Sequence, residues 1–200
     1  VVPKNTYRKY NLRLSNTTKI GKYVEIIPSL SFVRSENDKV LRSAGGYMLS
    51  LFAWPNTDDI RDYQDQNGNK LPLFSANANA DLDNPFFNVN KNRSQDETDR
   101  YTASIGININ PFTWLSIAGR FGYDTYKMDG YTAYHPKTFY IAQSLNGQQD
   151  NFYRRYYGYN HTITATGRKN IGNFSTRLMV GTMWQDYETR MFEVLGNNLA

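Results

Sequence analysis

Strict alternation of apolar and polar side chains is the feature of this sequence that most limits its fold. In residues 111–127, PFTWLSIAGRFGYDTYK, every second position from Leu115 to Tyr123 is apolar or glycine. The positions between them are small, polar or charged, and they include Arg120 and Asp124. Because successive side chains of a β-strand point to opposite faces, this pattern predicts a strand with one apolar face and one polar face.

The same alternation returns in five further stretches, so the sequence predicts an all-β chain of about six strands. These stretches are residues 10–16, 23–34, 100–110, 156–167 and 174–185. Pro28 lies on the apolar row of the second stretch. Proline cannot donate to the hydrogen-bond ladder, so we expect an edge, a bulge or a broken register there.

The predicted connections alternate between short and long. The short ones, 19–22, 110–114 and 168–173, contain the Gly, Pro or Asn that tight hairpin turns require. The long ones cover about 34–99, 128–155 and 186–200. A soluble β-sandwich mixes short loops at both ends, whereas an outer-membrane barrel has short periplasmic turns and long extracellular loops. The sequence therefore predicts an antiparallel transmembrane β-barrel segment.

Hydropathy is compatible with this prediction. The mean hydropathy of −0.67 comes without any long apolar run, which excludes a transmembrane helix but not a transmembrane strand. Aromatic residues near strand ends would form the girdles at the two membrane interfaces. Trp114 is assigned to the periplasmic girdle, and Phe32, Tyr123, Tyr157 and Trp184 to the outer one. The polar rows would line a wet lumen, with Arg13, Arg120, Asp124 and Arg177 facing inward.

Six strands are too few to close a barrel, because bacterial barrels begin at about eight strands. The sequence also begins without Met, has no signal peptide, and ends inside a predicted loop at residues 186–200. We therefore expect residues 1–200 to be a partial outer-membrane barrel domain belonging to a larger barrel.

Other classes of function remain as alternatives or are disfavoured. A soluble all-β carbohydrate-binding or adhesion module would show the same alternation, with its apolar rows packed on a second sheet. The chain has no cysteine and two histidines, His135 and His161, and it shows no catalytic constellation, so an enzyme is not expected. The net charge is +5, but the basic residues are scattered, which disfavours a nucleic-acid groove. His161 falls on the outward row and is interpreted as an interfacial aromatic.

No resident cofactor or metal site is predicted. Asp81, Asp83 and Asn84 could suggest Ca²⁺ in an extracellular loop, and this possibility stays open. An EF-hand loop with Gly68 at its sixth position would begin at Tyr63, which is not a ligand, so that motif fails.

Aromatic residues of the predicted loops are the candidate ligand contacts, because a ring with a polar tip can stack on a sugar or pack on a peptide side chain. They could equally fold the loops on themselves. Trp54 and Tyr131 are the first candidates, and the full set is Trp54, Tyr63, Phe86, Phe87, Tyr131, Tyr134, Phe139 and Tyr140.

Three stretches together resemble the SusC/RagA family of TonB-dependent outer-membrane transporters. They are YNLRLSNTTKIGKYVEI, SLFAWPNTDDIRDYQDQNGNKLPL and DNPFFNVNKNRSQDETDRYTASIGININPFTWLSIAGRFGYDTY. The resemblance covers most of residues 7–185, and the order and spacing of the motifs carry it because no single motif is diagnostic.

The resemblance implies a parent barrel of roughly 22 strands that holds an N-terminal plug in the outer membrane of a Gram-negative bacterium. Members of the family import oligosaccharides, glycans or peptides, driven by TonB. They usually pair with a SusD-like surface lipoprotein, which closes over the barrel as a lid and would be a further partner of the loop aromatics. This sequence lacks what would be the plug and the TonB box, so the 200 residues could not gate or couple energy by themselves.

Overall fold

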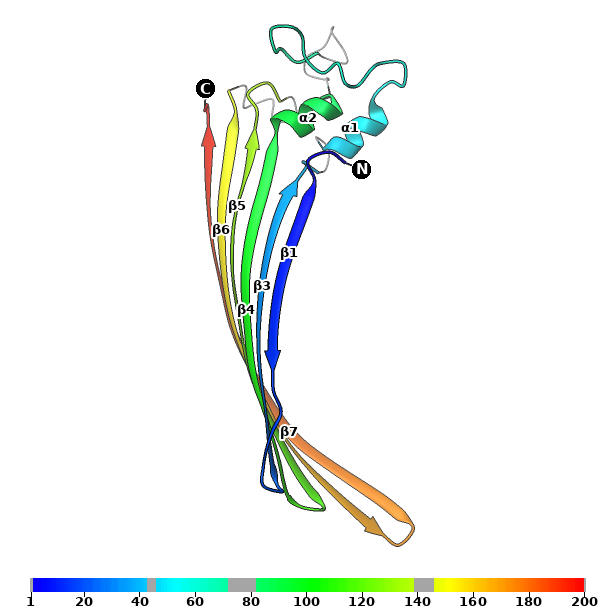
Figure 1. Cartoon of the computed structure of the whole chain (residues 1–200), viewed down its shortest axis with the longest axis vertical. Coiled ribbons are helices and arrows are strands. Elements are labelled where there is room, and N and C mark those ends of the chain that lie inside the picture. The colour runs from blue at the N-terminus through cyan, green and yellow to red at the C-terminus, as the bar shows by residue number, and fades with distance from the viewer. Residues whose placement is uncertain (1, 43–45, 72–81, 139–145, 200) are drawn as a thin grey trace.

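The structure, a computed structural model, describes residues 2–42, 46–71, 82–138 and 146–199. It is a long, curved antiparallel sheet with two short helices at one end (Figure 1). The elements in chain order are β1 (Thr6–Ser15), β2 (Thr18–Ile20), β3 (Val24–Lys39), α1 (Tyr47–Ala53), α2 (Pro85–Lys91), β4 (Arg93–Phe112), β5 (Leu115–Tyr134), β6 (Gln148–Ile171) and β7 (Phe174–Asn197).

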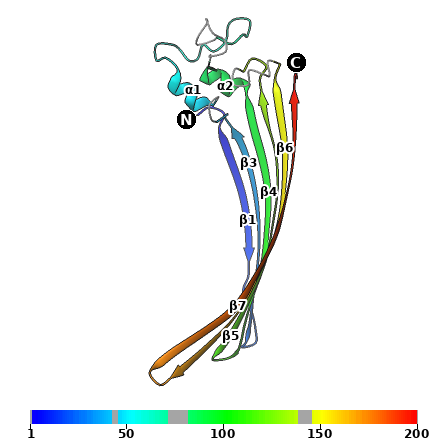
Figure 2. The same cartoon turned by 180° about the vertical axis from the view of Figure 1, so that it is seen from behind.

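The strands follow one another across the sheet in the order β1-β3-β4-β5-β6-β7, with β2 paired to β3. Every pairing is antiparallel. The tight turns lie together at one end of the sheet and the helices lie at the other, as both views show (Figure 2). Among the described strands, β1 and β7 each pair on one side only, so the sheet is open. The predicted all-β antiparallel architecture is confirmed.

The strands are longer than the sequence predicts. Within the expected loops 34–99, 128–155 and 186–200, β3 continues to Lys39, β5 continues to Tyr134 and β7 continues to Asn197. The β3 extension is polar on both faces, and the β7 extension mixes polar and apolar residues on each face. The alternation therefore disappears from the sequence while the backbone ladder continues. Cross-strand side-chain pairs such as Arg34–Glu97, at 2.5 Å, add to this ladder.

Pro28 does not break the register of its own strand, because it pairs with Ile105 inside a continuous β3–β4 ladder. The interruption falls in the neighbouring strand, where β1 ends at Ser15 and β2 begins at Thr18. Opposite the proline, the backbone N–H of Asn16 donates to the carbonyl of Pro28 at 3.1 Å. The proline has no N–H with which to return that bond, which accounts for the local gap.

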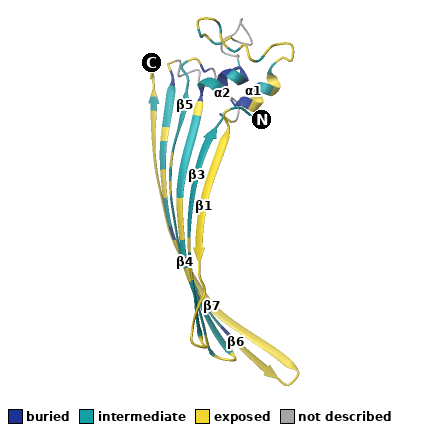
Figure 3. Cartoon of the chain, viewed as in Figure 1, coloured by how far each residue is buried: buried dark blue, intermediate teal, exposed yellow. Residues whose placement is uncertain are grey.

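The sheet is a single layer without a core of its own. The buried hydrophobic residues among those described are Leu41, Tyr47, Phe87 and Val89, and all four lie at the helical end. The edge strands β1 and β7 are exposed almost throughout and the strands between them are mostly intermediate (Figure 3). On β7, Leu178 is 71% exposed. No second sheet in the described ranges covers the apolar rows, as a soluble sandwich would require. Within the described ranges, no helix combines the length and the apolar character needed to span a membrane.

Candidate functional site

The strand register divides the side chains into two faces. Directly paired residues share a face, so Leu12, Phe32 and Tyr101 lie in one row of the sheet. Arg13, Ser31 and Thr102 form the adjacent row on the opposite face. The first face carries the predicted lipid-facing residues and is called the outer face below. The second carries the predicted lumen-facing residues and is called the inner face.

The outer face holds an apolar band that ends in an aromatic residue on each long strand. Charged residues follow directly beyond the band, as Arg34 does after Phe32 and Arg155 does after Tyr157. Aromatic rings at the boundary between an apolar and a charged surface are typical of a membrane interface. The terminal aromatics are Tyr10, Phe32, Tyr101, Tyr123, Tyr157 and Trp184.

Aromatic contacts join neighbouring strands within this band. The ring of His161 lies between Phe121, at 5.4 Å, and Trp184, at 5.3 Å between ring centroids. The sequence-based interpretation of His161 as an aromatic of the outward row agrees with this placement. At the turn end, Trp114 stacks on Phe112 with centroids 5.5 Å apart.

All four predicted lumen-facing residues lie on the inner face. Asp124 of β5 accepts two hydrogen bonds from the guanidinium of Arg100 on β4, at 2.8 and 2.5 Å, and a third from Thr102. Arg13 and Arg120 border a common hollow of about 610 Å³. Arg177 pairs in register with Arg168 near the β6–β7 turn.

A ladder of tyrosines on the inner face was not predicted from the sequence. Tyr126 and Tyr156 are cross-strand partners whose rings stack with centroids 5.2 Å apart, and Tyr187 stacks on Tyr156 at 6.5 Å. The Tyr156 side chain lies along its own strand, over the buried Gly158. A β-carbon on Gly158 would stand only 2.5 Å from the Tyr156 hydroxyl. These rings lie on the polar rows, where alternation alone gives no signal for an aromatic ligand surface.

A smaller hollow of about 290 Å³ adjoins the tyrosine ladder. Tyr156 and Gly158 border it together with Asn160 and Gln185, whose amides can donate and accept hydrogen bonds. Arg120 borders both this hollow and the larger one. The inner face therefore presents a continuous polar surface with aromatic hydroxyls at the helical end and guanidinium groups nearer the turns.

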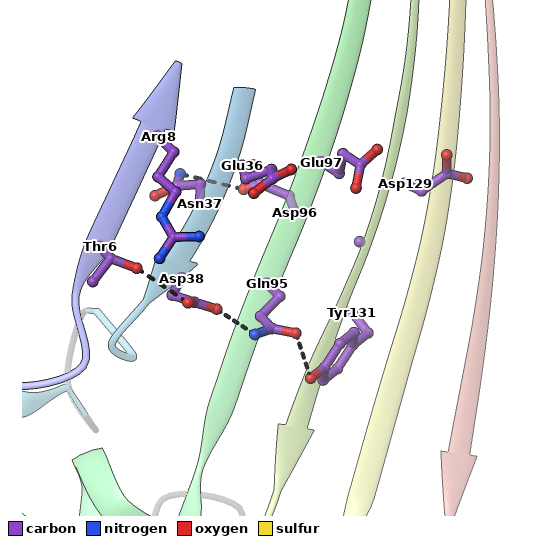
Figure 4. Close-up of a pocket in the computed structure, with 11 residues that line it drawn as sticks. Thr6, Arg8, Glu36, Asn37, Asp38, Gln95, Asp96, Glu97, Asp129 and Tyr131 are labelled. Atoms are coloured by element: carbon purple, nitrogen blue, oxygen red, sulfur yellow. Dashed lines mark hydrogen bonds between the residues drawn. The ribbon is translucent and has the colours of Figure 1, made fainter. Parts of the chain in front are cut away.

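Tyr131, a predicted ligand contact, lies on the outer face, beyond the apolar band. It borders a hollow of about 470 Å³ (Figure 4), in which its hydroxyl donates to Gln95 Oε1 at 2.7 Å. Gln95 in turn donates to Asp38, which also accepts from Thr6 at 3.1 Å. This chain of hydrogen bonds ties four strands together on the side that faces away from the inner hollows.

The two helices and the segments beside them, residues 46–71, 82–92 and 135–138, are called the loop layer here. This layer contains most of the other predicted ligand contacts. Phe87 has no exposed surface, and its ring meets His135 edge-on at 5.5 Å and Tyr63 at 6.5 Å. It therefore holds the layer together and offers no face to a ligand in this structure. Trp54 and Phe86 are partly exposed.

Tyr134, at the end of β5, falls on the inner face by register and is partly exposed. The predicted contacts Phe139 and Tyr140 lie outside the described residues.

Buried polar contacts fix the loop layer to the sheet. Asn92 Oδ1 accepts from the backbone N–H of His135 at 2.9 Å and from the Thr138 hydroxyl at 2.8 Å. Helix α2 begins after Asn84, whose side chain accepts from the Phe86 N–H at 2.8 Å, an ordinary N-cap. Alternation of hydrophobicity could not have revealed these asparagines.

The residues considered for Ca²⁺ are engaged otherwise or lie outside the described residues. Asp83 is 3% exposed and forms an ion pair with Lys70 at 3.0 Å, so an ammonium group stands where a cation would bind. Asp81 lies outside the described residues. Within the described ranges, no group of three or more His, Asp or Glu side chains is placed to hold a metal ion.

A curved single sheet with an exposed apolar face and a polar face defines the chain as part of a β-barrel wall. Comparison with solved structures agrees: the chain matches the structure of the RagAB peptide transporter with a TM-score of 0.70 and 15% identity over 97% of its length. The RagAB peptide importer in the closed-closed state gives a TM-score of 0.69 at 15% identity and 97% coverage. Its open-open state gives 0.70 at 14% identity and 98% coverage.

The chain spans only 22% of the length of each of these matched chains. At this low identity the likeness establishes the fold, which is that of part of the RagA-type barrel, and the matched proteins are transporters. No protein-family model and no curated protein matches the chain.

Proposed function

We propose that this chain is part of the barrel wall of a TonB-dependent outer-membrane transporter of the SusC/RagA type. The observation that carries the proposal is the single-layer sheet, whose exposed outer face is apolar between its aromatic ends and the tight turns. In water such a face would need a covering layer, whereas in a bilayer acyl chains cover it. The likeness to a peptide transporter over 97% of the chain supports the same assignment.

The cargo in this proposal is a peptide or an oligosaccharide, delivered with a SusD-like surface lipoprotein acting as the lid. The partly exposed aromatics Trp54 and Phe86 of the loop layer, with Tyr134 at the end of β5, would contact the cargo or the lid. The tyrosine ladder would provide a second polar surface on the inner wall below them. TonB would act through a plug domain that a longer parent protein supplies.

The test is uptake by the full-length transporter that contains this chain, produced in the outer membrane of a Gram-negative host together with its lipoprotein. We expect accumulation of fluorescent peptides or oligosaccharides that stops when TonB is deleted. Uptake that is independent of TonB would contradict the assignment.

A second experiment separates this proposal from a soluble carbohydrate-binding or adhesion module. The 200-residue chain is expressed without detergent, and its size and unfolding are measured. We expect aggregation, because Leu12, Leu14 and Leu30 each expose about half of their surface or more. A monodisperse monomer that unfolds cooperatively would favour the soluble module.

A further inference from the structure

Two arginines on the inner face share one hollow although they are far apart in the sequence. Arg13 comes from β1 and Arg120 from β5, and the hollow of about 610 Å³ lies over the strands between them and over β6. Both arginines are exposed residues on the inner face of the sheet.

No carboxylate borders this hollow among the described residues. The two nearest acidic residues on the inner face already have partners. Asp124 is held by the guanidinium of Arg100 and by Thr102, and Glu25 accepts a hydrogen bond from Asn108 at 2.9 Å. Neither Arg13 nor Arg120 forms an ion pair with a described residue, in contrast to Arg100.

The rest of the lining suits a small anionic group. Short side chains between the arginines, including Ser29, Gly106 and Ala118, leave room for a ligand against the sheet, and Ile27 and Asn108 also border the hollow. Hydroxyl groups from Ser15, Ser104, Thr162 and Thr164 stand around it. Guanidinium groups with neighbouring hydroxyl donors form the charge-assisted hydrogen bonds that carboxylates prefer.

We propose that this hollow, defined by Arg13 and Arg120, binds carboxylate groups of the cargo on the inner wall of the barrel. This inference rests on the proposed transport function and narrows it, because it predicts selection for acidic cargo. The carboxylate belongs either to Asp and Glu side chains of a peptide or to the uronic acids of an oligosaccharide. The chemistry at the arginines is the same in both cases.

Direct binding to the purified full-length transporter tests the proposal without requiring energised uptake. The probes are a Glu-containing pentapeptide, its Gln counterpart, a glucuronate-containing oligosaccharide and its neutral glucose counterpart. We expect one of the acidic probes to bind more tightly than its neutral counterpart, and the pair that differs identifies the source of the carboxylate. Equal affinities within both pairs would overturn the proposal.

Substitutions then locate the site. Arg13→Gln and Arg120→Gln should each weaken binding of the acidic probe by about tenfold, as expected for a lost charged hydrogen bond, and leave the neutral probe unchanged. Arg→Lys at either position should restore part of the preference. Arg8→Gln is the matched control, because Arg8 lies on the same strand but on the outer face. A double variant that keeps the full preference for acidic probes would place the selectivity elsewhere.

Failure of this inference is distinguishable from failure of the transport proposal. If the transporter imports neutral cargo in a TonB-dependent manner but shows no acidic preference, only the hollow is reassigned. If it binds acidic probes through these arginines but imports nothing, the binding site stands and the transport function falls.

Discussion

The hydroxyl of Tyr156 lies over Gly158, its second neighbour on the same face of β6, and leaves no room for a β-carbon there. Gly158→Ala should therefore push the Tyr156 ring out of the tyrosine ladder, and we expect a loss of about 1–3 kcal/mol in the free energy of unfolding. Denaturant unfolding of the full-length protein in detergent measures this loss.

The control is Gly167→Ala on the same strand, where nothing lies within 4 Å of the added carbon. In a Tyr156→Ala background the effect of Gly158→Ala should nearly vanish, because the obstructing hydroxyl is gone. An unchanged effect in that background would assign the strain to the backbone.

Adjacent residues of β7 provide a direct test of the two faces. Val180 lies on the outer face and is 64% exposed, while Met179 lies on the inner face and is 59% exposed. Val180→Lys should destabilise the assembled barrel by about 2–4 kcal/mol, and Met179→Lys by much less, because only the first places a charge among acyl chains. Heat-modifiable mobility on gels reports assembly. Equal sensitivity at the two positions would contradict the assignment of faces.

His135 should make the loop layer sensitive to pH. Burial, followed by the charges of Lys91 and Lys137, lowers the pKa of His135 from its usual 6.5. Its Nδ1 accepts the Lys137 backbone N–H at 3.2 Å, an interaction of the neutral ring. As the pH falls, His135 is therefore protonated first in the unfolded layer. The stabilisation that the neutral ring gives to the folded layer is present above pH 6.5 and is lost as the pH falls through the lowered pKa.

Hydrogen exchange of residues 84–92 and 134–138 at pH 7.5 and pH 5 measures this effect. The protection factor, which corrects for the slower intrinsic exchange at low pH, should be smaller at pH 5 than at pH 7.5. His135→Asn keeps an acceptor near Nδ1 but has no proton to gain, so its protection should change little between the two conditions. A variant that retained the full pH dependence would show that another group is responsible.

Asn92 should be essential to the attachment of the loop layer. Its side-chain oxygen accepts from both His135 and Thr138, and the residue is 5% exposed. Asn92→Ala leaves the buried Thr138 hydroxyl and the partly buried His135 N–H without an acceptor, with an expected loss of about 1–3 kcal/mol. Asn92→Asp keeps the acceptor oxygen and should be less harmful. Limited proteolysis of the loop layer distinguishes the two variants.

Alternation alone predicted the strands, the tight turns and the face of each side chain in the apolar band, because a period of two follows directly from backbone geometry. It failed where polar and apolar residues no longer alternate, so the extensions ending at Lys39 and Tyr134 were expected to be loops. The tyrosine ladder depends on cross-strand register, which joins Tyr126 to Tyr156 across thirty positions. The hollow between Arg13 and Arg120 depends on five strands lying side by side, which no local pattern encodes.

The position at which the apolar band ends differs between the two edges of the sheet. On β7 the band ends at Trp184, which lies in the same cross-strand row as Pro28 and its β1 neighbour Asn16. On β1 the band ends at Tyr10, six positions before Asn16. That shift is about 20 Å along the strands over about 24 Å across them, so the strands lean by roughly 40° from the bilayer normal. A strand added beside β7 should therefore carry its interfacial ring about one residue closer to the turns than Trp184. The same strand tilt would then continue around the barrel.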